Sequence, residues 1–232
     1  MDKATLYSDL EWIEKKASYK QAFELFYKLA QVRYATFKQL HPLNHRVATK
    51  PNLVRFVEQG YLFTHDLVKN QPAYSITEKA RKILNFELYN TKILQKNFTG
   101  QSLDHALKIT DCLLKLQASP EFYNVFYPFF REPPDYKSEF LRPDFCVIWK
   151  KENSYKIQFG EVEQPKANWD NYLLIKRANY ERLASDKNLY DIWWSEWSKR
   201  LNLPMCKKED FCFSVLCVGN IKKEWSGWKF EC

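Results

Sequence analysis

The spacing of hydrophobic residues predicts a largely helical first module within residues 15–90. Apolar side chains recur at helical spacing from Tyr19 to Tyr34 and predict a first core helix. A short second helix is expected at 36–40, closed by His41-Pro42, because a residue before proline disfavours the helical conformation. A third helix is expected at 52–59, with its start a few residues earlier as an alternative and Gly60 as the residue that ends it.

The next residues predict a β-hairpin and one more helix. Strand-like runs at 61–65 and 73–77 flank a polar loop, and a helix is expected at 78–84. Three helices, a two-stranded wing and a closing helix resemble the winged helix-turn-helix family, most clearly in Leu53 to Leu62 followed by Tyr74 to Thr77. The resemblance implies that the third helix enters the DNA major groove and the wing touches the backbone. The implied DNA contacts are Arg46, Lys50, Asn52, Arg55 and Lys69. Protein binding by this module is the alternative.

The rest of the chain predicts a second module that mixes helices with strands. Residues 86–101 lack a clear period and are expected to connect the two modules. The predicted domains are therefore 1–90 and 102–232, and the whole chain is expected to be α+β with an α/β second domain. The expected elements of that domain are a helix at 103–117, strands at 123–130, 144–149 and 155–162, a helix at 167–185 and a strand at 211–218.

The positive charge is concentrated in the first module. The chain carries a net charge of +8. Residues 1–100 hold 16 Lys and Arg against 9 Asp and Glu, a net charge of +7, whereas residues 101–232 hold 20 against 19, a net charge of +1. Because neutralising phosphates supplies most non-specific affinity for DNA, this asymmetry favours DNA as the partner of the first module. A merely soluble basic surface is the alternative.

Composition excludes several other classes of protein. No apolar run approaches the roughly 20 residues of a membrane span, and the start of the chain lacks a secretory signal, so we expect a cytoplasmic protein without a membrane partner. The six cysteines contain no C-x2-C pair and are expected to be reduced thiols, not zinc ligands or disulfides. With five glycines there is no phosphate-cradling loop. The tryptophans at 191–197 are expected to anchor a core or an interface, with stacking on single-stranded DNA as the alternative.

Acidic residues flank two consecutive predicted strands. Asp144 opens the first strand, and Glu161 and Glu163 close the second with a spacing that places both on one face. We therefore expect three carboxylates to converge at neighbouring strand ends. Crowded carboxylates repel one another unless a hard divalent cation lies between them, and Mg²⁺ binds through one or two carboxylates, water and substrate phosphates. The pattern predicts a metal-dependent phosphodiester site.

The same motifs resemble a known nuclease superfamily. Arg142-Pro143-Asp144, Glu161-Val162-Glu163 and the segment Leu174 to Tyr180 are similar to the PD-(D/E)xK nucleases, which have a restriction-endonuclease-like α/β domain. Together with the winged helix, His105-Ala106-Leu107 and the Lys-x3-Tyr spacing, they look like the plasmid-borne replication-relaxation family. This narrower resemblance covers most of residues 15–185.

The resemblance implies a DNA endonuclease that acts in plasmid or mobile-element replication or maintenance. Asp144 and Glu161 would hold Mg²⁺ or Mn²⁺ with help from the Val162 carbonyl, and the metal would stabilise charge on the scissile phosphate and activate a water. Glu163 occupies the position where the superfamily's motif has lysine. Either Lys176 supplies the missing ammonium, or Glu163 acts as a general base. Tyr180 shares the helical face of Lys176 and either positions a phosphate or packs over the sheet.

Two further expectations concern accessory residues and partners. His105 is an accessory candidate, although a histidine in an apolar helical stripe is more often structural. A homodimer is expected because cutting both strands usually requires two active sites, and replication or mobile-element proteins are the expected protein partners. The alternative function is a catalytically inactive DNA-binding regulator of replication or transcription, in which the acids form ordinary salt bridges with Lys176 and Arg142.

Overall fold

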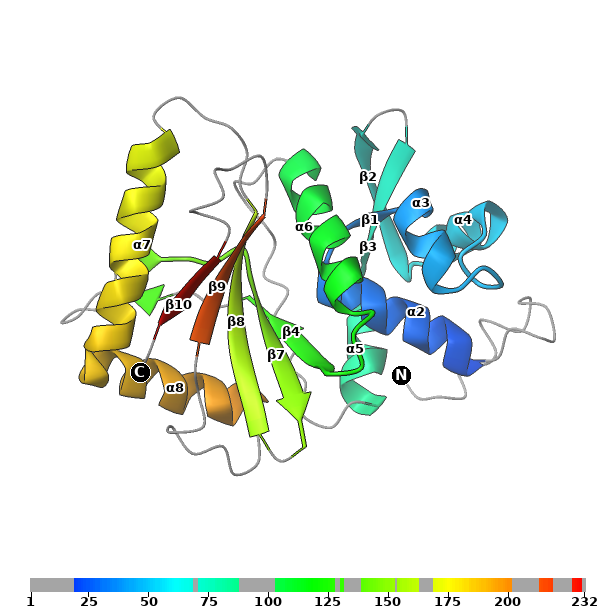
Figure 1. The fold of residues 1–232 in the computed structure, drawn as a ribbon. Coiled ribbons are helices and arrows are strands. Elements are labelled where there is room, and N and C mark those ends of the chain that lie inside the picture. The colour runs from blue at the N-terminus through cyan, green and yellow to red at the C-terminus, as the bar shows by residue number, and fades with distance from the viewer. Residues whose placement is uncertain are drawn as a thin grey trace. The chain divides into compact units, whose positions relative to one another are not determined.

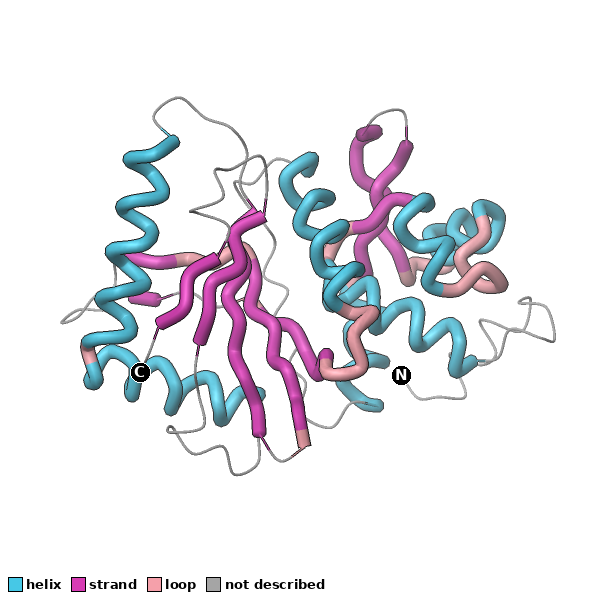
Figure 2. Tube along the Cα trace, in the orientation of Figure 1, coloured by secondary structure: helices cyan, strands magenta, loops and turns pink. Residues whose placement is uncertain are grey.

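The chain folds into two compact units, Met1–Leu114 and Lys115–Cys232. A computed structural model describes residues 19–68, 71–87, 103–127, 130–131, 139–152, 154–162, 169–201, 213–218 and 227–230. Both units combine helices with a β-sheet (Figures 1 and 2). This mixture agrees with the predicted α+β class.

The first unit places a small three-stranded sheet among helices. The sheet has the strand order β1-β3-β2, and both of its strand pairs are antiparallel. The predicted hairpin is therefore present, with a third short strand at its edge. The elements are α2 (Tyr19–Val32), β1 (Ala35–Thr36), α3 (Phe37–Leu40), the 3-10 turn η1 (His41–Leu43), α4 (Lys50–Glu58), β2 (Leu62–Val68), β3 (Gln71–Ile76), α5 (Glu78–Glu87) and α6 (Leu103–Leu116).

Helix α4 begins and ends at residues that satisfy its terminal backbone groups. The Thr49 hydroxyl accepts a hydrogen bond from the Asn52 backbone N–H at 3.3 Å and caps the helix. Gly60 has a positive φ of 73°, which favours glycine, and terminates the helix as predicted. The Gly60 N–H donates to the Val57 carbonyl and the Tyr61 N–H to the Phe56 carbonyl, which is the Schellman pattern. The helix is thereby held at both ends.

The boundary between the units lies further along the chain than predicted. Most of α6 belongs to the first unit and not to the second. The Thr110 hydroxyl donates to the Tyr34 carbonyl at 2.5 Å, and the Gln39 amide donates to the Leu107 carbonyl at 3.1 Å and to Asp111 Oδ1 at 2.6 Å. These bonds attach α6 to elements more than 60 residues earlier in the chain, a pairing that helical periodicity alone does not specify.

The second unit has a five-stranded mixed sheet with the order β10-β9-β8-β7-β4. Strands β4, β7 and β8 are antiparallel neighbours, β8 and β9 are parallel, and β9 and β10 are antiparallel. Helices α7 and α8 connect the two parallel strands. The elements are β4 (Phe122–Phe126), β5 (Phe130–Arg131), β6 (Glu139–Leu141), β7 (Phe145–Lys151), β8 (Ser154–Val162), α7 (Trp169–Ser185), α8 (Lys187–Leu201), β9 (Phe213–Val218) and β10 (Gly227–Phe230).

Helices α7 and α8 share a hydrophobic core with the sheet. The Phe159 ring on β8 lies 5.6 Å from the rings of both Tyr180 and Trp193, measured between centroids. Trp193 is only 5% exposed, which confirms the predicted core role for this member of the tryptophan-rich segment. The segment lies on α8, a helix that the sequence pattern did not predict.

Two of the cysteines that were expected to be reduced are free thiols in the structure. Cys112 and Cys146 are free and buried, which agrees with the expectation of reduced cysteines at these positions. Across the part of the chain that the structure describes, no helix has the length and apolar character needed to cross a membrane.

Candidate functional site

The β7–β8 hairpin brings the two predicted metal-binding acids together. The register pairs Phe145 with Gly160, so Asp144 immediately before β7 lies beside Glu161 near the end of β8. Gly160 allows this close pairing, because a Cβ atom at that position would overlap the Phe145 ring. Antiparallel pairing thus converts a separation of 17 residues in sequence into adjacency at one edge of the hairpin.

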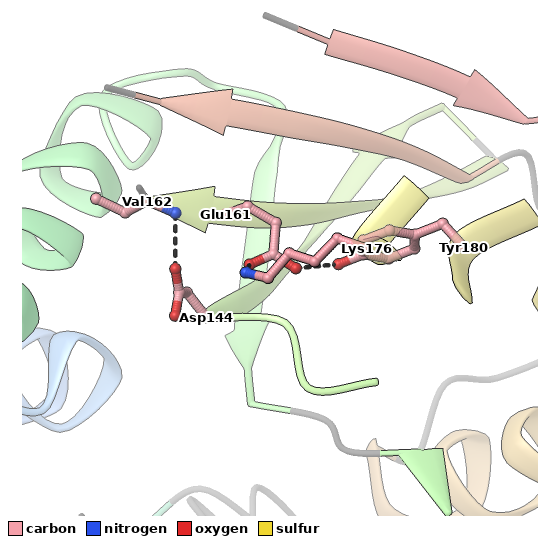
Figure 3. A network of polar contacts seen from close by, with 5 residues as sticks. All are labelled: Asp144, Glu161, Val162, Lys176 and Tyr180. Atoms are coloured by element: carbon pink, nitrogen blue, oxygen red, sulfur yellow. Dashed lines mark hydrogen bonds and ion pairs between the residues drawn. The ribbon is translucent and has the colours of Figure 1, made fainter. Parts of the chain in front are cut away.

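Asp144 is held against β8 at two points. Its backbone N–H donates to the Gly160 carbonyl at 3.0 Å, and its Oδ2 accepts a hydrogen bond from the Val162 N–H at 2.7 Å (Figure 3). The residue is 7% exposed. These contacts orient the carboxylate before any ligand is bound. Val162, expected to assist through its carbonyl, contributes its backbone N–H to this contact.

Glu161 is fully buried, and each of its carboxylate oxygens has a partner on α7. The Lys176 ammonium lies 2.5 Å from Oε2, and the Tyr180 hydroxyl donates to Oε1 at 2.7 Å (Figure 3). Both partners come from the Lys-x3-Tyr segment, whose spacing places them on one helical face. The structure therefore joins four predicted residues, Asp144, Glu161, Lys176 and Tyr180, around one end of β8.

Tyr172 extends the site by one more helical turn and was not predicted. The Lys176 ammonium lies 4.9 Å from the centroid of the Tyr172 ring, a cation–π distance. Tyr172, Lys176 and Tyr180 are spaced i, i+4 and i+8, so a search of α7 for aromatic residues at that spacing would have found Tyr172. The lysine consequently lies between a buried carboxylate and a tyrosine ring that is 37% exposed.

Burial raises the pKa of the Glu161 carboxyl from 4.5 to about 7. The Lys176 charge acts against this shift, the Asp144 charge adds to it, and the hydrogen bonds from Lys176 and Tyr180 again lower the pKa. Desolvation is the largest of these effects. Glu161 therefore changes charge in the physiological range, as perturbed carboxyls at functional sites often do.

The donor set is suited to a hard divalent cation. Asp144 and Glu161 supply carboxylate oxygens, the ligand type that Mg²⁺ and Mn²⁺ prefer, and two such groups suffice when water and phosphate complete the coordination. Glu163, the third predicted acid, lies outside the described residues. Among the residues that are described, no group of three or more His, Cys, Asp or Glu side chains gathers at one place. The predicted convergence of three acids is therefore established for two of them.

Four of the five expected DNA-contacting residues lie in a segment without acidic side chains. Residues 25–57 contain six Lys or Arg and no Asp or Glu. Arg46, Lys50 and Arg55 are exposed on or beside α4. The Asn52 amide instead donates to the backbone carbonyls of Arg46 at 3.3 Å and Val47 at 3.1 Å, so it stabilises the preceding turn. Lys69 lies outside the described residues.

His105 is not part of the network around Glu161. It lies in the first turn of α6, in the first unit, and is partly buried. This placement is compatible with the structural role that its apolar surroundings in sequence suggested.

The chain has no match among family models, curated proteins or solved structures.

Proposed function

We propose that this protein binds DNA and hydrolyses its phosphodiester bonds at a divalent-metal site in the second unit. One observation carries the proposal: Asp144 lies close enough to Glu161 for its charge to raise the Glu161 pKa, and the buried Glu161 carboxylate is bonded to Lys176 of α7. Buried charges are costly, so proteins rarely keep such clusters away from a ligand or a reaction. The network also follows the motif order of the PD-(D/E)xK nucleases that the sequence resembles.

Each residue of the network has a distinct role in the proposed reaction. Asp144 and Glu161 hold Mg²⁺ or Mn²⁺, which supplies Lewis-acid stabilisation of the scissile phosphate when bound. The Val162 N–H fixes the orientation of Asp144, and the Tyr180 hydroxyl fixes that of Glu161. The Lys176 ammonium stabilises negative charge that develops on the phosphate. Glu163 remains the alternative to Lys176 for assisting the attacking water.

The first unit is proposed to dock the duplex as a winged helix-turn-helix. Its element order of helix, short strand, two helices and hairpin supports this proposal, as does the three-stranded sheet. The exposed residues Arg46, Lys50 and Arg55 on and beside α4 are suited to phosphates or base edges. The resemblance to the replication-relaxation family suggests action in plasmid or mobile-element replication or maintenance.

A cleavage assay tests the proposal. Supercoiled plasmid is incubated with Mg²⁺ or Mn²⁺ and with the native chain, Asp144→Ala, Glu161→Ala or Glu181→Ala. Glu181 is the matched control, because it is an exposed glutamate of the same unit that is also ion-paired to a basic residue of α7. Nicking by the native chain and Glu181→Ala, with loss in the other two variants, is the expected result.

Cleavage that persists in Asp144→Ala and Glu161→Ala would place the reaction elsewhere or in a contaminant. If the expected result is obtained, Lys176→Ala and Glu163→Ala then show which residue replaces the lysine missing from the motif.

A second candidate function is a DNA-binding regulator without nuclease activity. It is favoured by the engagement of both Glu161 oxygens by protein groups, because each oxygen then has a partner without a metal. Duplex binding that is retained in Asp144→Ala and Glu161→Ala, without cleavage by the native chain under either metal, would support the regulator.

A further inference from the structure

The Lys176 ammonium occupies the carboxylate oxygen that a metal ion would need. It lies 2.5 Å from Glu161 Oε2, while Tyr180 holds Oε1 at 2.7 Å. The glutamate is 0% exposed and the lysine side chain 14% exposed, so solvent screens their attraction only weakly. A divalent cation and an ammonium on the same oxygen would repel each other strongly. The two cations therefore compete for this oxygen.

The same ammonium has a second partner on its own helix. The Tyr172 ring lies one turn earlier, 4.9 Å from the ammonium, and is 37% exposed. An ammonium that leaves Glu161 can remain over this ring and nearer to solvent, at a cation–π contact. The flexible four-carbon stem of lysine permits such a shift without movement of the helix. The Tyr172 ring would therefore still hold the ammonium once its contact with Glu161 is lost.

We infer that Lys176 is a built-in counter-ion, which keeps the Asp144–Glu161 site closed and is displaced toward Tyr172 when a divalent cation binds. The inference rests on the proposed function, since it concerns the same carboxylates, and it adds a regulatory step. Metal-free protein keeps Glu161 neutralised by the lysine. A divalent cation held by Asp144 and Glu161 would displace the ammonium toward Tyr172, where it would remain available to a substrate phosphate.

The test is Mn²⁺ binding to the full chain without DNA, measured by isothermal titration calorimetry. Lys176→Met removes the competing charge and should bind Mn²⁺ about tenfold more tightly than the native chain, a gain of about 1.4 kcal/mol. Lys176→Arg retains a cation and should bind no more tightly than the native chain. Lys156→Met is the matched control, because Lys156 is an exposed lysine on β8, and its affinity should stay within about twofold.

Equal or weaker Mn²⁺ binding by Lys176→Met would overturn the inference, because the lysine would then assist the metal or ignore it. If Lys176→Met does not fold, the native chain still provides a test through the ¹H–¹⁵N NMR signal of the Lys176 ammonium, assigned by its loss in Lys176→Arg. Saturation with Mg²⁺ should shift that signal. A signal that is unchanged at saturation would also overturn the inference.

The inference and the proposed function fail in different ways. Native protein that binds Mn²⁺ and cleaves DNA, with no gain in affinity in Lys176→Met, would refute the counter-ion role alone. Tighter binding by Lys176→Met, with no cleavage by the native chain under any metal, would support the counter-ion role and refute the nuclease.

Discussion

Helix α7 contributes the basic residues of two ion pairs, Lys176 and Arg177. The two residues are adjacent in sequence, but their ion pairs lie in different environments. Lys176 meets Glu161 at 2.5 Å with side chains that are 14% and 0% exposed. Arg177 meets Glu181 at 2.9 Å with side chains that are 49% and 53% exposed. An exposed pair contributes little to stability, whereas a buried pair is costly to form and more costly to break. The same chemistry therefore has different energetic consequences in a solvated pair and in a buried one.

Removing the basic residue from each pair should show the largest difference in stability between the buried pair and the exposed one. Lys176→Met leaves Glu161 buried without its counter-charge and should lower the free energy of unfolding by about 3 kcal/mol. Arg177→Met should lower it by less than about 0.5 kcal/mol. Urea denaturation of both variants and the native chain measures the difference. Equal losses would mean that Glu161 reaches solvent or another partner when the lysine is absent.

A pH titration of stability tests the same contrast without removing a charge. The folded pKa of Glu161, about 7, exceeds the unfolded value of 4.5, so the folded chain binds more protons between these values. The resulting stabilisation is fully present below pH 4.5 and is lost as pH rises through 7, by up to about 3 kcal/mol.

The free energy of unfolding of the native chain should therefore contain a contribution that falls as pH rises from 4.5 to about 7. This contribution should be absent from Glu161→Gln. Glu181→Gln is the control and should keep the native pH dependence, since its carboxylate is exposed. If the same loss of stability remains in Glu161→Gln, a group other than Glu161 causes it.

Two glycines extend the comparison to the backbone of each unit. Gly160→Ala would force a methyl group into the Phe145 ring beside Glu161, and overpacking of this kind costs about 2 kcal/mol. Gly60→Ala has open space around the added methyl but keeps a positive φ, which costs about 1 kcal/mol. Thermal or urea unfolding ranks the two. A larger loss of stability in Gly60→Ala than in Gly160→Ala would show that Phe145 and β8 move to accommodate the added methyl group.

The last prediction concerns the basic surface of the first unit. Replacing Arg46 and Arg55 by alanine should weaken duplex binding roughly tenfold and reduce the slope of log affinity against log salt by about 2. Arg177→Ala, an exposed arginine of the second unit, is the control and should leave both quantities near the native values. Fluorescence anisotropy with a labelled duplex over a range of salt concentrations measures both. An unchanged slope would mean that the docking surface does not include α4 or the turn before it.

Much of the local structure follows from residue order alone. The apolar spacing predicted α2 and the other helices of the first unit, and Gly60 marked the end of α4. The α-helix α3 does end before His41-Pro42, but His41 keeps helical dihedrals and continues into η1, contrary to the effect expected of the proline. The acids at the limits of β7 and β8 were predicted to lie close together, which the hairpin register confirms for Asp144 and Glu161. These features depend on interactions within a few residues or on one hairpin, where geometry is nearly independent of the rest of the chain.

Only the tertiary structure decided which elements pack together. It attached α6 to the first unit, gave the Asn52 amide a role in the turn before α4, and revealed α8. It also turned Lys176 and Tyr180 toward Glu161 and placed Tyr172 beside the lysine. Periodicity specifies which side of a helix is buried, but the residues that it meets there depend on long-range packing and on the balance between desolvation and pairing. The sequence therefore determined the acids and the helix that approaches them, and the fold determined that their charges meet in a buried site.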